Sequence, residues 1–320
     1  MLTPEERQLL AKSATRLTHE IHIRLVVTDD DQSAEFEKYC ELLASLSPKI
    51  RIKKEREASY RPPSIGFEPS ILLHALPQGT ELSPFIELML AECNPGVADN
   101  ETPERNFEIP AMFKLFVSPV CPFCPVMMKK LFPAALAYPA LHLTVVDVAL
   151  FPEMAKSDEI KSAPTLILDN TFRWTGSIDM DDLFKVIRHR DPVKLSMESL
   201  KSMIVNGDAF RLAEMMISQQ IIFPAFFDLL AHEEFSTRLG AMVAAEALAE
   251  KDRSIAAQLI DPLLDRFENQ IDQIKGDILY IIGQVGDSRI IPFLKDIVSG
   301  EYTSDVKEAA ADAIDNINAS

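Results

Sequence analysis

The chain has 320 residues, of which 47% are hydrophobic, so it is long enough to form two or three domains with proper cores. Its net charge of −17 argues against nucleic acids and anionic membranes as partners, because both attract basic surfaces. No apolar run reaches the length of a membrane span, and four cysteines are too few for a secreted disulfide scaffold, so we expect a cytoplasmic protein.

The first block, residues 1–105, has the pattern of an α/β unit. A helix is expected after Thr3, and alternating apolar residues predict a strand over 21–27. Apolar residues three and four positions apart predict a second helix after Ser33. The other elements of this block are three short strands and a closing helix, expected over 50–53, 64–67, 71–74 and 81–92. The turn-rich segment 94–103 is expected to be a linker.

The second block, residues 106–190, repeats that order of elements. A strand over 112–117 leads directly into a helix that opens with two cysteines, Cys121 and Cys124. The remaining elements are expected as a strand, a short helix, a hairpin of two strands and a final helix, over 141–146, 151–156, 166–169, 172–175 and 180–189. The repeated order implies an internal duplication in which the first copy has no sulfur in the corresponding turn, residues 29–32.

The third block, residues 191–320, shows helical periodicity and no strand pattern. Three segments superpose when Arg238, Lys275 and Lys307 are aligned, and apolar residues then recur at the same positions after each of them. Paired helices that repeat at the spacing of Arg238, Lys275 and Lys307 predict an α-solenoid. The block carries 22 acidic against 11 basic side chains, so most of the negative charge of the chain lies there.

Cys121-Pro122-Phe123-Cys124 carries the clearest chemical signal. Two thiols separated by two residues can close into a disulfide and reopen with little backbone movement. A helix N-terminus stabilises a thiolate, so Cys121, expected to be exposed, is the candidate nucleophile and Cys124, one turn deeper, the resolving thiol. Pro122 is expected to stiffen the turn between them.

The alternative for this pair is half of a four-cysteine zinc site, which would need a second pair. Cys40 lies on an apolar helical face and is expected to be buried. Cys93, at a helix end, is expected to be a bystander thiol that could be exposed. The histidines lack ligand spacing, so no metal site is expected.

The second block resembles the thioredoxin/glutaredoxin superfamily, on its strand–C-x-x-C–helix junction and on Ala163-Pro164-Thr165 before the hairpin. The resemblance implies that Pro164 is the cis-proline facing the disulfide and that the backbone of Ala163 pairs with an incoming peptide. Substrate contacts are thus expected from Pro122, Phe123, Ala163, Pro164 and Thr165.

The tandem arrangement over residues 1–190 is similar to the N-terminal domain of the flavoprotein subunit of alkyl hydroperoxide reductase and to tandem protein disulfide oxidoreductases. Further landmarks of this resemblance are Arg61-Pro62-Pro63-Ser64, Gly79-Thr80-Glu81-Leu82, Cys124-Pro125 and Val146-Asp147. The third block resembles short HEAT repeats. The expected fold is therefore two tandem thioredoxin-like α/β folds followed by a HEAT-like α-solenoid.

The sequence also departs from these families. No G-x-G-x-x-G motif occurs, so we expect no flavin or nicotinamide domain and no cofactor besides the redox-active disulfide, with an external reductant. Val120 stands where thioredoxins carry tryptophan, and the single glycine of Gly176-Ser177-Ile178 gives no support for glutathione use.

Asp147 is expected to cap the loop after its strand rather than to accept a proton from Cys124.

These expectations favour a thiol–disulfide oxidoreductase that uses Cys121 and Cys124, with the solenoid docking a protein partner. The partner is expected to be a protein disulfide or a peroxidase-like protein, with no nucleic acid and no membrane involved. The alternative is a redox-sensing scaffold, in which the oxidation state of the thiols controls docking without turnover.

Overall fold

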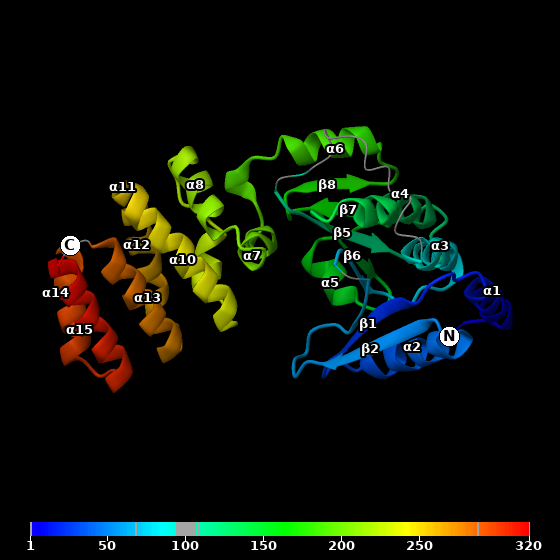
Figure 1. The fold of residues 1–320 in the computed structure, drawn as a ribbon, viewed down its shortest axis with the longest axis horizontal. Helices are drawn as coiled ribbons and strands as arrows, with labels where there is room; N and C mark the ends of the chain where they lie inside the picture. The colour runs from blue at the N-terminus through cyan, green and yellow to red at the C-terminus, as the bar shows by residue number, and fades with distance from the viewer. Residues whose placement is uncertain (1, 68, 94–106, 108, 287, 320) are drawn as a thin grey trace. The chain divides into compact units, whose positions relative to one another are not determined.

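The chain divides into two compact units, Met1–His189 and Arg190–Ser320 (Figure 1). The structure, a computed structural model, describes residues 2–67, 69–93, 107, 109–286 and 288–319. The linker expected at 94–103 lies outside the described residues. Each unit is considered by itself below, and residues 2–93 and 107–189 are called the first and second half of the first unit.

Each half of the first unit contains the elements expected for it, but the expected repetition of a single order is wrong, because among the described residues only the second half has a helix between its second and third strands. The first half contains α1 (Pro4–Ala14), β1 (Ile21–Val27), α2 (Ser33–Leu46), β2 (Ile50–Arg56), β3 (Ser64–Phe67), β4 (Ile71–His74), the 3₁₀ turn η1 (Gly79–Glu81) and α3 (Leu82–Glu92). The second half contains β5 (Ala111–Val117), α4 (Cys124–Ala137), β6 (Leu141–Asp147), α5 (Pro152–Ser157), β7 (Thr165–Leu168), β8 (Phe172–Thr175) and α6 (Met180–Arg188).

One sheet joins the two halves. In the described part of the chain it has eight strands, in the order β2-β1-β3-β4-β6-β5-β7-β8. The two halves meet where β4 pairs in parallel with β6, from Ile71 opposite Leu143 to His74 opposite Val146. Beyond the strands, α3 of the first half packs beside α4 of the second (Figure 1). The halves therefore share a single core, and residues of one half can reach the turns of the other.

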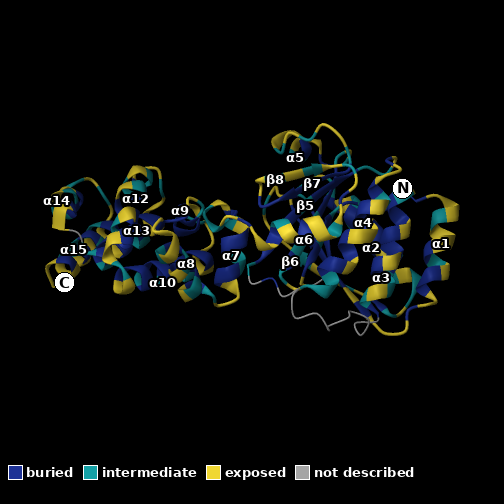
Figure 2. Cartoon of the chain, turned by 90° about the horizontal axis from the view of Figure 1, so that it is seen from above, coloured by how far each residue is buried: buried dark blue, intermediate teal, exposed yellow. Residues whose placement is uncertain are grey.

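Local sequence signals explain the helix ends and the core. Thr3 and Glu6 form a reciprocal capping box at the start of α1, and Asp179 accepts two backbone N–H groups at the start of α6. On β5 the alternating residues Ala111, Phe113 and Leu115 are buried, as the period of a strand requires. Figure 2 shows the same division of buried and exposed surfaces along the helices.

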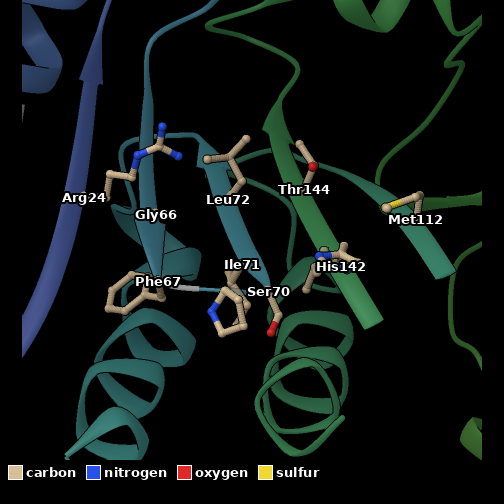
Figure 3. Close-up of a pocket in the computed structure, with 11 residues that line it drawn as sticks. Arg24, Gly66, Phe67, Ser70, Ile71, Leu72, Met112, His142 and Thr144 are labelled. Carbon is tan, nitrogen blue, oxygen red and sulfur yellow. The ribbon is translucent and has the colours of Figure 1, made fainter. Parts of the chain in front are cut away.

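One helix of the second half has no counterpart in the described first half. Residues 57–63 connect β2 to β3 without a helix, whereas α5 occupies the equivalent connection in the second half. A hollow of about 240 Å³ opens on the seam between the halves, where Arg24, Leu72 and Thr144 lie on β1, β4 and β6 (Figure 3). The duplication is thus not symmetric.

The second unit is helical, as expected. Its main helices are α7 (Met197–Val205), α8 (Ala209–Gln219), α9 (Phe226–Leu230), α10 (Phe235–Lys251), α12 (Ile260–Phe267), α13 (Asp272–Val285), α14 (Ile291–Ser299) and α15 (Ser304–Ala319), with η3 (Pro192–Lys194), α11 (Arg253–Ala256), η4 (Ala257–Leu259) and η5 (Ser288–Ile290) between them. The aligned cations Arg238, Lys275 and Lys307 lie on α10, α13 and α15, each near the start of its helix.

Two of these cations are buried and bound. Arg238 is fully buried, and its Nε donates to Asp277 Oδ2 at 2.8 Å. Lys275 Nζ lies 5.4 Å and 5.3 Å from the ring centroids of Phe267 and Tyr302, within the range of cation–π attraction. These contacts link α13 to α10, to α12 and to the segment before α15. Among the described helices of the whole chain, none combines the length and the apolar character needed to cross a membrane.

Candidate functional site

The two cysteines of the C-x-x-C motif lie between the end of β5 and the start of α4. The helix begins at Cys124, so Cys121 stands in the turn before it and not in the first helical turn that the sequence suggested. Cys124 is fully buried, and Cys121 is only 9% exposed, so the expectation of an exposed Cys121 is wrong. Both thiols are free. The reason for the burial of Cys121 is found in two segments that pack on the turn.

The first of these segments is the loop before β7. The Cys121 thiol donates to the carbonyl oxygen of Ala163 at a sulfur–oxygen distance of 3.3 Å. The Ala163–Pro164 peptide bond is cis. Thr165 is buried at the start of β7, where its hydroxyl donates to the Ser162 carbonyl at 2.7 Å. The structure thus brings Ala163 and Pro164 to the nucleophile, while Thr165 holds their loop.

The second segment comes from the first half of the unit. Thr80 in η1 donates its backbone N–H to the carbonyl oxygen of Pro119 at 3.1 Å. Its hydroxyl lies 3.0 Å from the carbonyl oxygens of both Pro119 and Cys121. Gly79 makes this approach possible, because a Cβ there would lie 2.6 Å from the Pro119 oxygen. The turn that carries the nucleophile is therefore held by the half that has no cysteine pair.

The same segment places a buried acid beside the thiols. Glu81 is fully buried, and neither oxygen of its carboxyl group has a hydrogen-bond partner. Burial, reinforced by the charges of Asp147 and Cys121, raises the pKa of Glu81 to about 9, so the carboxyl group is protonated at neutral pH. Burial also raises the pKa of Cys124, with smaller contributions from Cys121 and Glu81. Glu81 is thus a proton-carrying group next to the thiols.

Asp147, unlike Glu81, is held by hydrogen bonds from the loop that follows its strand. It is buried at the end of β6, and its Oδ1 accepts the backbone N–H of Ala149 at 2.8 Å. Burial raises the pKa of Asp147 in spite of hydrogen bonds from the backbone of Ala149 and Leu150. The expected loop cap at the end of this strand is confirmed. Glu81, in contrast to Asp147, accepts no hydrogen bond from the backbone.

Exposed apolar side chains, here called the apolar rim, flank Cys121 along the chain. Val120 and Phe123 are 86% and 67% exposed, and Val126 on the first turn of α4 is half exposed. Pro122 lies between them, before the helix begins, so its ring stiffens the turn without taking part in the helix. Exposed apolar side chains of this size beside a reactive group form a suitable contact surface for an apolar segment of a substrate.

The other cysteines lie apart from this chemistry. Cys40 is buried on α2 as expected, and burial raises the pKa of its thiol to about 12. Cys93 is also buried, and its thiol donates to the carbonyl oxygen of His19 at 3.4 Å, so the expectation that it could be exposed is wrong. Among the residues that the structure describes, no three histidine, cysteine or acidic side chains gather as metal ligands would.

Two site residues, Thr80 and Glu81, are not identified as such by the sequence, where they belong only to the landmark Gly79-Thr80-Glu81-Leu82. The sequence gives no signal for Glu81, because an acidic residue just before a helix is common. Nothing local connects either residue with a cysteine turn some forty positions away, because that link requires the pairing of β4 with β6.

Comparisons with known proteins agree with this geometry. A family model described as a thioredoxin domain matches residues 112–188, the second half of the unit. The chain is 25% identical over 219 residues to the F subunit of alkyl hydroperoxide reductase from Xanthomonas campestris pv. phaseoli, covering 65% of this chain and 41% of that protein. It is 21% identical over 173 residues to a protein named NADH dehydrogenase of Bacillus subtilis, covering 52% and 34%. The chain thus spans about a third to two-fifths of the length of these curated relatives.

Solved structures show the same fold. The N-terminal domain of alkyl hydroperoxide reductase AhpF from Enterococcus faecalis matches with a TM-score of 0.50 and 22% identity, covering 58% of this chain and all of that domain. A protein disulfide oxidoreductase from Aeropyrum pernix matches with a TM-score of 0.51 and 14% identity, covering 61% and 96%. The first unit is therefore a thioredoxin-like α/β domain.

Proposed function

We propose that the chain is a thiol–disulfide oxidoreductase in which Cys121 and Cys124 form the redox-active pair. The observation that carries this proposal is the geometry of the second thioredoxin-like half. Cys121 contacts the carbonyl of Ala163 beside a cis-proline, and Cys124 is buried at the first position of α4. A reactive thiol at an opening and a second thiol behind it are the two parts that disulfide exchange requires.

The exchange proceeds in two displacement steps. The Cys121 thiolate attacks one sulfur of a substrate disulfide, and the other substrate sulfur leaves as a thiolate with the electron pair of the broken bond. Cys124 then attacks the sulfur of Cys121, which releases the second substrate sulfur and leaves a disulfide between Cys121 and Cys124. The pair has then given two electrons to the substrate, and a dithiol reductant from outside the chain restores both thiols.

Glu81 serves these steps as a proton exchanger for Cys124. When the Cys121–Cys124 disulfide is reduced, the protonated carboxyl group gives its proton, through an intervening water molecule, to the sulfur of Cys124 as that sulfur leaves. When the disulfide forms, the ionised fraction of Glu81 accepts the proton of the Cys124 thiol by the same route. A buried carboxyl group without a fixed hydrogen bond suits this task, because no partner competes for its proton.

The apolar rim and the Ala163 backbone indicate the class of substrate. An extended peptide segment could pair with the backbone near Ala163 while its apolar side chains contact Val120 and Phe123. We therefore propose a protein disulfide as the substrate. The relative from Xanthomonas campestris is named as a subunit of alkyl hydroperoxide reductase, which supports a peroxidase-like protein as the partner.

We propose in addition that the second unit is a HEAT-like solenoid that docks this partner. The support is the repetition along α10, α13 and α15, whose corresponding positions Ala241, Ile278 and Ala310 are all fully buried. Its surplus of acidic side chains favours a partner with a basic surface. Docking on such a unit would raise the local concentration of the partner near the thiols.

Reduction of insulin disulfides in the presence of dithiothreitol tests the proposed activity. The wild-type chain should accelerate the reaction, and the Cys121→Ser variant should not. The Cys124→Ser variant should accumulate mixed disulfides through Cys121, which mass spectrometry would identify together with the trapped protein. If the wild-type chain fails to reduce any protein disulfide but still binds a partner in one oxidation state, the redox-sensing scaffold is the correct function.

A further inference from the structure

The turn that carries Cys121 has few hydrogen bonds of its own. Pro119 and Pro122 have no N–H group to donate. Within the turn, the Cys121 N–H donates to the Ser118 carbonyl at 2.9 Å. The carbonyl oxygens of Pro119 and Cys121 instead accept from Thr80, which belongs to the other half of the unit. The conformation of the turn therefore depends on a residue distant in sequence.

Thr80 is itself fixed from the opposite side. The neighbouring Gly79 donates its N–H to Glu6 Oε1 at 2.6 Å, and the second carboxylate oxygen of Glu6 accepts the Thr3 N–H at 2.6 Å. These two bonds lower the pKa of Glu6, the Thr3 bond more than the Gly79 bond, so the carboxylate stays charged and keeps both of them at neutral pH. The loop that holds Thr80 is thereby anchored to the start of α1.

We propose that Thr80 is the positioning residue of the dithiol turn, and that its hydroxyl keeps the sulfur of Cys121 within reach of Cys124 during exchange. The inference rests on the proposed function and assigns to the half without the cysteine pair a share in the rate of that reaction. The Thr80 hydroxyl bonds to backbone carbonyls of the turn, so it acts through Cys121 and not on the substrate.

The step that depends on this positioning is the second displacement. With Cys121 in a mixed disulfide, the Cys124 sulfur forms a bond to the Cys121 sulfur, and the bond from Cys121 to the substrate sulfur breaks. The substrate sulfur leaves as a thiolate with the electron pair, and the Cys124 proton passes to Glu81 in its ionised form. An intramolecular displacement depends steeply on the placement of the two reacting atoms, so a loosened turn slows it even though both thiols remain.

The reagent 5,5′-dithiobis(2-nitrobenzoate), mixed in excess with the reduced chain in a stopped-flow instrument, separates the two displacements. Its attack by Cys121 releases one coloured thionitrobenzoate at a rate that increases with reagent concentration. The attack by Cys124 releases a second at a rate independent of that concentration. The buried thiols of Cys40 and Cys93 do not contribute to these fast phases.

The informative variants are Thr80→Val, which keeps the shape and removes the hydroxyl, and Thr80→Ser, which restores the donor. We expect Thr80→Val to slow the second phase about tenfold and Thr80→Ser to recover most of the wild-type rate. Thr28→Val is the matched control, because Thr28 also donates its hydroxyl to a backbone carbonyl, that of Arg61 at 2.6 Å, but in the cysteine-free turn. It should leave both phases unchanged.

A second measurement covers the case in which the two phases of the wild-type chain overlap. The equilibrium constant for closing the Cys121–Cys124 disulfide against dithiothreitol should fall about fivefold in Thr80→Val, because a looser turn lowers the effective concentration of Cys124. Wild-type values for both the second phase and this constant in Thr80→Val would overturn the positioning role while leaving the proposed function intact. Release of a single thionitrobenzoate by the wild-type chain would instead overturn the proposed function.

Discussion

The two halves of the thioredoxin-like unit build the same turn for different purposes. In the second half, the chain leaves β8 through Gly176 and enters α6 at Asp179, an exposed residue that caps the helix. In the first half, it leaves β4 and enters η1 and α3 through Gly79 and Glu81, and the acid there is fully buried beside the thiols of the other half. The half that lacks the cysteine pair thus supplies the buried acid Glu81, and its Thr80 binds the dithiol turn of the half that has the pair.

The glycines of these two turns differ in the same way. Both have positive φ angles, +55° at Gly79 and +84° at Gly176. A Cβ at Gly176 would meet no atom within 4 Å, whereas one at Gly79 would press on the Pro119 carbonyl at 2.6 Å. A duplicated turn has become an internal contact surface in one half and has stayed a solvent-facing connection in the other.

The largest effect is expected when the dithiol turn of the second half loses its nucleophile, since the corresponding turn of the first half has no cysteine. Cys121→Ser removes the nucleophile at the opening, so insulin reduction should fall at least about a hundredfold, to the rate of dithiothreitol alone. Cys40→Ser is the matched control, since it changes a buried thiol on α2 and should leave the rate unchanged. A Cys121→Ser variant that keeps most of its activity would remove the basis for the proposed function.

Glu81→Gln tests the contribution of the first half to proton transfer. The amide keeps the size of the side chain but cannot exchange a proton with Cys124, so the reduction of the Cys121–Cys124 disulfide by dithiothreitol should slow about a hundredfold at about pH 7.5. Glu87→Gln, on the exposed side of α3 where Glu87 pairs with Lys129, should have no effect. Equal rates for Glu81→Gln and the wild type would show that Cys124 exchanges its proton elsewhere.

The same variant should change the pH dependence of stability. The pKa of Glu81 is about 9 in the folded chain and near the ordinary value of 4.5 when unfolded, so the unfolded state loses its proton first as the pH rises. The free energy of unfolding of the wild type should therefore fall between pH 4.5 and pH 9. Urea titrations should show Glu81→Gln to be more stable by on the order of 2–4 kcal/mol at about pH 7.5, with a flatter pH profile. A less stable variant with an unchanged profile would contradict the assigned burial of this acid.

How far the sequence predicts this site depends on the range of the interactions involved. The cysteine pair, the strand before it and the helix after it are local features, and the sequence predicts their positions within a few residues. It does not predict the burial of Cys121, because that burial results from Ala163 and Thr80, which lie about forty positions to either side. Glu81 escapes prediction for the same reason, since its place beside the thiols depends on the register of β4 against β6.

Alanine at the two turn glycines sharpens the comparison between the halves. Gly79→Ala combines a strained φ angle with a clash against the Pro119 backbone, so it should cost about 2–3 kcal/mol of stability. Gly176→Ala has the strained angle alone and should cost about 1 kcal/mol. Thermal and urea unfolding of the two variants provide the test. Similar costs at both positions would mean that the first turn does not press on the dithiol turn.

The smallest effect is expected at the apolar rim. Phe123→Ser removes an exposed ring from the contact surface, so the KM for insulin should rise about fivefold while the reaction with the small reagent 5,5′-dithiobis(2-nitrobenzoate) stays unchanged. Tyr60→Ser is a suitable control, because Tyr60 is also an exposed aromatic residue but lies in the β2–β3 connection of the first half. A loss of both reactions would indicate a disturbed turn and not a lost substrate contact.

A redox titration of the chain against mixtures of reduced and oxidised dithiothreitol, followed by peptide mapping, tests the central claim most directly. The account predicts a single two-electron transition that links Cys121 to Cys124 and leaves Cys40 and Cys93 as free thiols at every potential. Cys121 and Cys124 remaining reduced throughout, or pairing with other cysteines, would contradict it.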